Sequence, residues 1–113
     1  MRQNHFGGEF EEIVLKSVKG QVLVQTLTGA TSLAAPLARI YSLDPGGAGR
    51  NLTMPDEAAN KGAELYIINT ADAAEDITVK SSAAATVGVI SQNEGAVAVC
   101  DGVRWKIMVN AET

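Results

Sequence analysis

The stretch most suggestive of chemistry is the glycine-rich run LDPGGAGRNLTMP at residues 43–55, which lies between two apolar segments. A phosphate-binding loop follows the pattern G-x-x-x-x-G-K-[ST] or G-x-G-x-x-G, and a helix must follow it so that N–H groups hold the phosphate. Counted from Gly46, the first pattern needs its second glycine at position 51, but Asn51 stands there. Counted from Gly47, the second pattern needs its third glycine at position 52, but Leu52 stands there. Because residues 50–54 favour a strand rather than a helix, we expect the glycines to form a turn.

Histidine and cysteine, the usual residues of nucleophilic and metal sites, each occur once. His5 lies in a polar stretch near the N-terminus and Cys100 lies near the other end of the chain, so neither has a suitable partner nearby. The serines likewise have no histidine base close to them. The apolar neighbours Val97, Val99 and Trp105 predict that Cys100 is a small buried hydrophobic residue.

Acidic residues are the remaining candidates for acid–base chemistry. Asp72, the adjacent Glu75 and Asp76, and Asp101 all fall in predicted turns, where acids are common for local reasons. The sequence has no D-x-D-x-D-G calcium loop. We therefore expect no catalytic residue, no cofactor and no metal site, and we do not expect an enzyme.

Composition excludes further classes of function. The chain has 113 residues, enough for one domain with its own core. Its formal charge is −4 and it has no basic cluster, so a nucleic-acid partner is not expected. No signal-peptide stretch and no run of roughly 20 apolar residues is present, so no membrane partner is expected. We expect the protein to be made and folded in a reducing cytoplasm.

Short apolar or alternating runs bounded by turn residues predict strands along most of the chain. They lie at residues 13–18, 21–28, 38–43, 50–54, 64–69, 76–80, 86–90, 96–100 and 103–109. The segment 30–37 is predicted as a connection, and 55–62 as one short helical turn. In the last strand the alternation predicts that Val103, Trp105, Ile107 and Val109 face the core. This spacing predicts an all-β fold, a compact antiparallel β-sandwich or small barrel of jelly-roll-like or tulip-like form, spanning residues 12–113.

The first residues, 1–11, are predicted to form a flexible N-terminal arm. They are polar apart from Phe6 and Phe10, and Glu9 and Glu11 stand beside the rings. The rings can fold back onto the domain, or they can anchor the arm to a partner. On the second interpretation Phe6, Phe10, Glu9 and Glu11 are partner-binding residues.

The second half of the chain, from about residue 40 to 109, resembles small structural proteins of tailed bacteriophages. The resemblance rests on the runs RNLTMPDEAANKGAELYIINTADAAEDITV and AVAVCDGVRWKIMV. The matching positions are the pair Met54-Pro55, Gly62, the run 67–69 (IIN), the run 77–79 (ITV), and the hairpin from Asp101-Gly102 to Trp105.

Within that group the short length is most similar to a capsid decoration, or cement, protein. The resemblance implies a virion protein on the capsid exterior that binds the major capsid protein, often as a homotrimer, and stabilises the expanded shell. The same β pattern occurs in tail-fibre and baseplate modules, so a tail module that binds a receptor or connects virion parts is the alternative.

Overall fold

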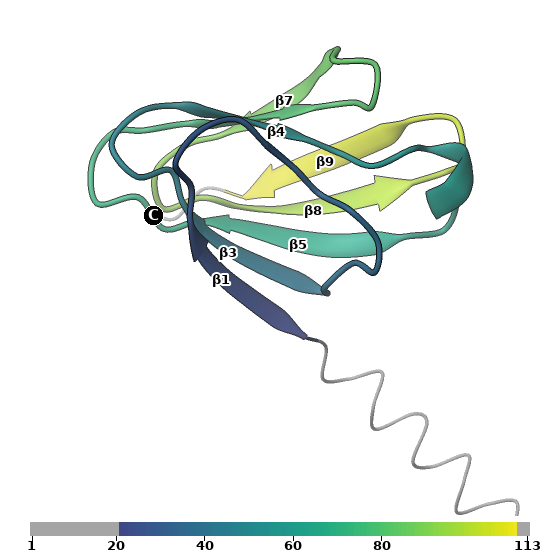
Figure 1. Cartoon of the computed structure of the whole chain (residues 1–113), viewed down its shortest axis with the longest axis horizontal. Coiled ribbons are helices and arrows are strands. Elements are labelled where there is room, and N and C mark those ends of the chain that lie inside the picture. The colour runs from purple at the N-terminus through teal and green to yellow at the C-terminus, as the bar shows by residue number, and fades with distance from the viewer. Residues whose placement is uncertain (1–20, 111–113) are drawn as a thin grey trace, which may run out of the picture.

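The computed structural model describes residues 21–110, and these form two packed β-sheets (Figure 1). The five-stranded sheet has the order β1-β3-β5-β8-β9 and the four-stranded sheet the order β2-β4-β6-β7. The predicted arm at 1–11 and the predicted strand at 13–18 lie outside the described residues. The strands are β1 (Val22–Thr26), β2 (Thr31–Ser32), β3 (Ile40–Asp44), β4 (Arg50–Thr53), β5 (Glu64–Asn69), β6 (Ile77–Lys80), β7 (Thr86–Ile90), β8 (Gly95–Cys100) and β9 (Trp105–Asn110).

The first six strands wind as a coil. The chain alternates between the two sheets from β1 to β6, so each turn of the coil adds one parallel strand to each sheet. The last three strands reverse direction. β7 is antiparallel to β6, β8 is antiparallel to β5, and β9 is antiparallel to β8.

The predicted all-β class with two packed sheets is confirmed, but antiparallel pairing holds only for the last three strands. The pairs β1/β3, β3/β5, β2/β4 and β4/β6 are parallel. The physical reason is that short connections carry the chain across to the opposite sheet. The next strand but one in sequence therefore returns to the first sheet in the same direction. The sequence could not show this, because side chains alternate in the same way in parallel and antiparallel strands.

The core lies between the sheets and consists mainly of aliphatic residues with one tryptophan. Cys100 is buried, as predicted, and pairs in register with Trp105. The indole Nε1–H of Trp105 donates a 2.9 Å hydrogen bond to the carbonyl oxygen of Pro55, which joins β9 to the loop after β4. The buried members are Leu27, Leu33, Tyr41, Leu43, Leu52, Met54, Leu65, Ile67, Ile77, Val79, Ile90, Ala96, Ala98, Cys100 and Trp105.

Two details of the sequence prediction are wrong at the ends of elements. The predicted connection 30–37 contains the short strand β2, which two residues are too few to reveal by alternation. Val103 was expected to face the core, but it lies in the turn before β9 and is 74% exposed. The predicted helical turn at 55–62 is a single 3-10 turn, η1 (Ala58–Asn60).

Among residues 21–110 no helix has the length and apolar character needed to cross a membrane.

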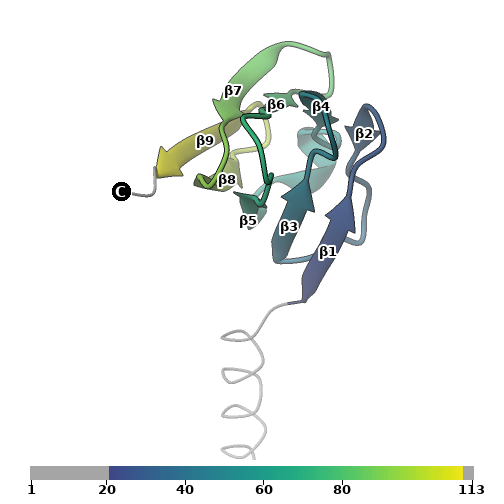
Figure 2. The ribbon, with the colours of Figure 1, turned by 90° about the vertical axis from the view of Figure 1, so that its left-hand side faces the viewer.

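The two lateral sides of the sandwich differ in whether the edge strands of the two sheets contact each other (Figure 2). At one side β7 and β9 pack against each other, and Gly88 lies so close to Ile107 that an added Cβ would be 2.5 Å from its Cδ1 atom. At the other side β1 and β2 form the edges of their sheets, each paired with one neighbour among the described residues. The sandwich is thus closed at the β7/β9 side and ends in two edge strands at the other.

Candidate docking surface

The outer face of the five-stranded sheet carries an apolar row that crosses every strand. The register places Val22 beside Ile40, Ile40 beside Tyr66, Tyr66 beside Val97, and Val97 beside Met108. Each of these residues has a neighbour in sequence that points into the core, so the row itself points outward. An antiparallel or mixed sheet with one solvated face normally carries polar residues there. We call this outer face, centred on Tyr66, the docking surface.

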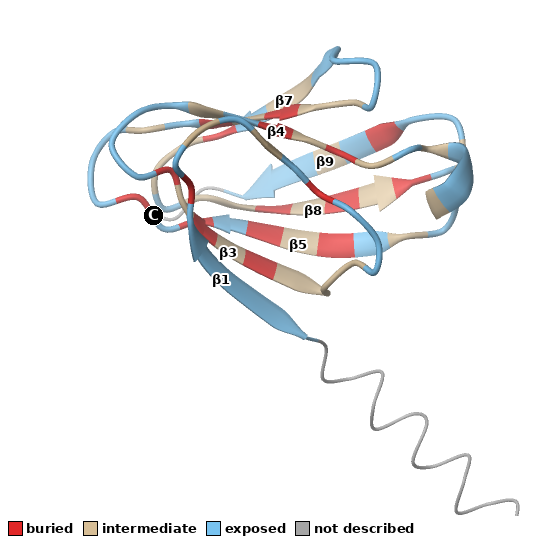
Figure 3. Cartoon of the chain, viewed as in Figure 1, coloured by how far each residue is buried: buried red, intermediate tan, exposed pale blue. Residues whose placement is uncertain are grey.

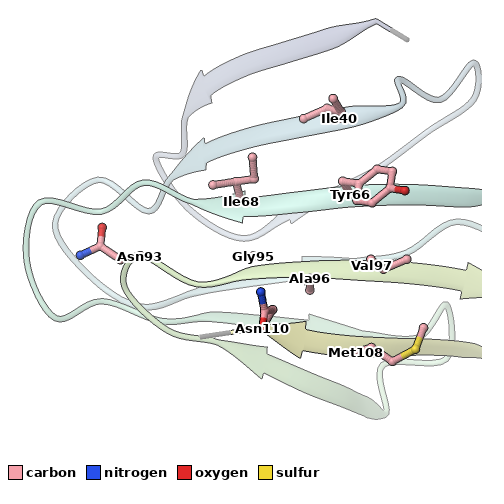
Figure 4. Close-up of a pocket in the computed structure, with 9 residues that line it drawn as sticks. All are labelled: Ile40, Tyr66, Ile68, Asn93, Gly95, Ala96, Val97, Met108 and Asn110. Atoms are coloured by element: carbon pink, nitrogen blue, oxygen red, sulfur yellow. The ribbon is translucent and has the colours of Figure 1, made fainter. Parts of the chain in front are cut away.

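Four members of this row, all except Val22, line a broad, open hollow of about 620 Å³ on the docking surface (Figure 4). Ile68 is 41% exposed and Met108 is 54% exposed, and both border the hollow. Gly95 lies opposite Ile68 in the ladder and has no side chain to fill the space. The lining residues are Ile40, Tyr66, Ile68, Asn93, Gly95, Ala96, Val97, Met108 and Asn110.

Charged residues lie at one end of this apolar surface. Glu64 pairs with Val99, and Val99 pairs with Lys106, which places an acid and a base on the same outward row. The guanidinium carbon of Arg39 lies 5.5 Å from the centroid of the Tyr66 ring, within the range of a cation–π contact. An apolar centre with tyrosine and arginine and a charged rim is the usual composition of a protein-binding surface.

The glycine-rich stretch forms the turn that the sequence predicts. Gly46 and Gly47 have φ values of 79° and 109°, and a Cβ at Gly46 would clash with the carbonyl oxygen of Leu27. Arg50 donates from Nε to the carbonyl oxygen of Pro45 at 2.7 Å and from a terminal nitrogen to that of Gly46 at 3.2 Å. The arginine therefore holds the turn itself together, and β4 rather than a helix follows.

The fold brings three acids together, two of which the sequence analysis considered. The carboxylates of Asp72, Glu75 and Asp44 each have an oxygen within 4.8 Å of the others. Asp44 accepts a hydrogen bond from the N–H of Gly46 at 2.9 Å, and Glu75 accepts one from Gly47 at 3.2 Å. Two of the three acids thus stabilise the same glycine turn, in agreement with the turn-making role predicted for acids in loops.

Two further acids have lowered pKa values because of local hydrogen bonds. The hydroxyl and the N–H of Ser82 donate to the carboxylate of Glu57 and lower its pKa. The N–H groups of Arg104 and Val103 donate to Asp101, each at 2.8 Å, and lower its pKa. Asp101 thereby fixes the turn between β8 and β9, where Gly102 has a φ of 95°. Glu57 is half-buried and Asp101 is exposed, and both lie in connections between strands. Asp76 does not join the three-acid group.

The four residues predicted to bind a partner, Phe6, Phe10, Glu9 and Glu11, lie outside the described residues. The docking surface was missed by the sequence analysis, which predicted a strand at 64–69 but no outward apolar face on it. In fact β5 alternates, and Tyr66 and Ile68 face outward. One signal was available in β9, where Met108 occupies the same phase as the polar residues Lys106 and Asn110.

Comparison with known proteins gives no relative: no protein-family model, no curated protein and no solved structure matches this chain.

Proposed function

We propose that this chain is a structural protein of a tailed bacteriophage that binds the outside of the capsid as a homotrimer and stabilises the expanded shell. The protein works by binding rather than by catalysis. The observation that supports a binding role most directly is the docking surface, an outward-facing apolar row that crosses all five strands of one sheet, with Val22 and Met108 exposed and the members between them half-buried. The phage assignment rests on the sequence resemblance over residues 40–109.

The docking surface suits a protein partner, here the major capsid protein. Large apolar side chains exposed in one continuous patch mark interaction sites rather than ordinary surface. The acidic chain, at −4, does not favour the phosphates of nucleic acid or of anionic lipids. Many copies on one lattice give strong total attachment even when each contact is small.

A tail-fibre or baseplate module is the second candidate, and the coil from β1 to β6 favours it. Each turn of such a coil stacks on the previous one through parallel ladders, so the same structure can be extended along one axis. An elongated connector that joins virion parts uses such a geometry. The two candidates differ in how many copies each particle contains.

The test is quantitative mass spectrometry of purified particles of the phage that encodes the chain. A fixed, high ratio to the major shell protein supports decoration. A small copy number that is a multiple of three or six supports the tail module. Absence of the chain from the particles would overturn both proposals.

A matched pair of variants tests the docking surface itself. Ile68 and Val89 are both 41% exposed, but Ile68 lies on the docking surface and Val89 on the outer face of the other sheet. We expect Ile68→Glu to weaken binding to shells stripped of the protein by about tenfold or more, because it places a charge in an apolar contact. Val89→Glu should bind as the unchanged chain does. Equal binding by both variants would exclude the docking surface as the contact.

A further inference from the structure

We propose that the hollow of the docking surface receives one large apolar side chain of the partner, which sits over Gly95, and that an acidic group of the same partner pairs with Arg39. This inference rests on the proposed function and names the feature of the partner that the docking surface recognises. It makes Gly95 the residue that determines which side chain fits.

The floor of the hollow is β8, whose outward residues are smaller than those of its neighbouring strands. Buried and half-buried residues alternate along β8, and Gly95 and Val97 belong to the half-buried, outward set (Figure 3). Gly95 lies between Ile68 on β5 and Asn110 on β9 (Figure 4). Larger side chains thus stand on both sides of a position that has none, which leaves room for a side chain from another molecule.

Neither the backbone nor the packing of the described residues requires a glycine at position 95. In the turn before β8 the left-handed residue is Asn93, with a φ of 66°, and Gly95 is not among the glycines with positive φ. A Cβ at Gly95 would lie 3.8 Å from the carbonyl oxygen of Ile67 and 4.0 Å from Cγ1 of Ile68, which are ordinary contacts. A glycine weakens a strand, and it often marks a place where another molecule approaches closely.

Gly88 on β7 is the other glycine within a strand between residues 21 and 110, and it shows the contrast. A Cβ there would lie 2.5 Å from Cδ1 of Ile107, so the packing of the chain itself excludes a side chain. No such contact in the described part of the chain accounts for Gly95. The open hollow lies over Gly95 instead, so the missing side chain serves what enters the hollow.

The lining of the hollow indicates an apolar occupant. Tyr66, Ile68 and Met108 are among the side chains that line it. Burying an apolar side chain against them is favourable, whereas a charged side chain would lose its water without gaining an ion pair. The amides of Asn93 and Asn110 also line the hollow, and they can form hydrogen bonds with the backbone of the partner. A pocket of this kind holds the anchoring side chain of a protein partner.

The charges beside the hollow favour an acidic group next to that apolar side chain. Arg39, Lys106 and Glu64 form no ion pair with any residue between 21 and 110. At this end of the docking surface two cations therefore face one acid, although the whole chain carries −4. The guanidinium of Arg39 lies over the ring of Tyr66, which lines the hollow. A carboxylate of the partner can pair with this guanidinium.

The first test compares Gly95→Val with Gly88→Val in the full-length chain by urea unfolding. We expect Gly95→Val to unfold at the same urea concentration as the unchanged chain or at a higher one, because valine favours a strand and meets open space. Gly88→Val should unfold at a lower concentration, because its side chain collides with Ile107. A lower midpoint for Gly95→Val would mean that the chain needs the hollow for its own fold, and would overturn the inference.

The second test measures co-sedimentation with shells stripped of the protein. Gly95→Val should bind about tenfold or more weakly than the unchanged chain, because valine occupies the place of the partner's side chain. Arg39→Gln should also bind more weakly, and its loss should shrink as the salt concentration rises. Lys80→Gln, on the outer face of the other sheet, should bind as the unchanged chain does. Unchanged binding by Gly95→Val or by Arg39→Gln would overturn the inference.

The variant Ile68→Glu separates a failure of this inference from a failure of the proposed function. If Ile68→Glu loses binding while Gly95→Val binds normally, the docking surface remains the contact and the hollow is excluded as the place of the anchor. If both variants bind normally, the docking surface itself is not the contact.

Discussion

At the scale of single residues, Asn69 shows how one polar side chain can organise several loops. It is 1% exposed at the end of β5. Its Nδ2 group donates to the carbonyl oxygens of Glu75 and Ile90, and its Oδ1 atom accepts from the N–H of Ala71, all at 2.9 Å. Buried backbone groups without partners are costly, and this one amide forms hydrogen bonds with backbone groups of three segments.

Replacing Asn69 by leucine should therefore destabilise the fold strongly. The change leaves backbone groups at Glu75, Ile90 and Ala71 without their side-chain partner, and we expect a loss of at least about 2 kcal/mol in the free energy of unfolding. Urea denaturation measures this loss. Asn51→Leu is the control, because Asn51 is exposed on β4, and it should change stability by less than about 0.5 kcal/mol. Equal losses from the two variants would show that the hydrogen bonds of Asn69 are unimportant.

At the scale of strands and turns, much of the fold was predictable from the sequence. The runs 64–69 and 86–90 match β5 and β7, and the glycine signals at Gly46 and Gly102 mark real turns. The direction of pairing was not predictable, because side-chain alternation is the same in parallel and antiparallel strands. The candidate site was not predictable as a surface either. Tyr66 and Met108 align only through registers that join strands distant in sequence.

The closed side of the sandwich gives a prediction at this scale. Gly88 on β7 faces Ile107 on β9, and a Cβ there would lie 2.8 Å from Cγ1 of the isoleucine. Gly88→Ala should lower the free energy of unfolding by about 1 to 3 kcal/mol, because it overpacks the contact between the two strands. The double variant Gly88→Ala with Ile107→Val should recover part of this loss, because valine lacks the Cδ1 atom. Additive losses in a double-mutant cycle would contradict the steric explanation.

At the scale of the whole molecule, we assign partner binding to the predicted arm at 1–11 and the core to the described residues 21–110. Among the described residues, the members of the core lie between Leu27 and Trp105. The sequence hypothesis assigns Phe6, Phe10, Glu9 and Glu11 to partner binding. Folding and attachment are then separable properties of the chain.

Deleting residues 1–11 should therefore leave the thermal unfolding midpoint of the chain unchanged and abolish its binding to stripped shells. Circular dichroism measures the first property and co-sedimentation with shells the second. A full-length variant with Phe6→Ala and Phe10→Ala separates the rings from the rest of the arm and should bind as poorly as the deletion. Retained binding by the deleted chain would refute the role assigned to the arm.

The mixed pairing also has a consequence for the order in which the chain folds. The hairpins β6–β7 and β8–β9 are local, whereas β1 and β2 pair in parallel with strands that follow only after a crossing to the opposite sheet. Local contacts close faster than distant ones. The last-synthesised hairpins should therefore nucleate the structure, and the first-synthesised turn should be among the last parts to dock. During synthesis, residues 21–38 would therefore leave the ribosome before their partner strands exist, and they would stay exposed until the rest of the sandwich has formed.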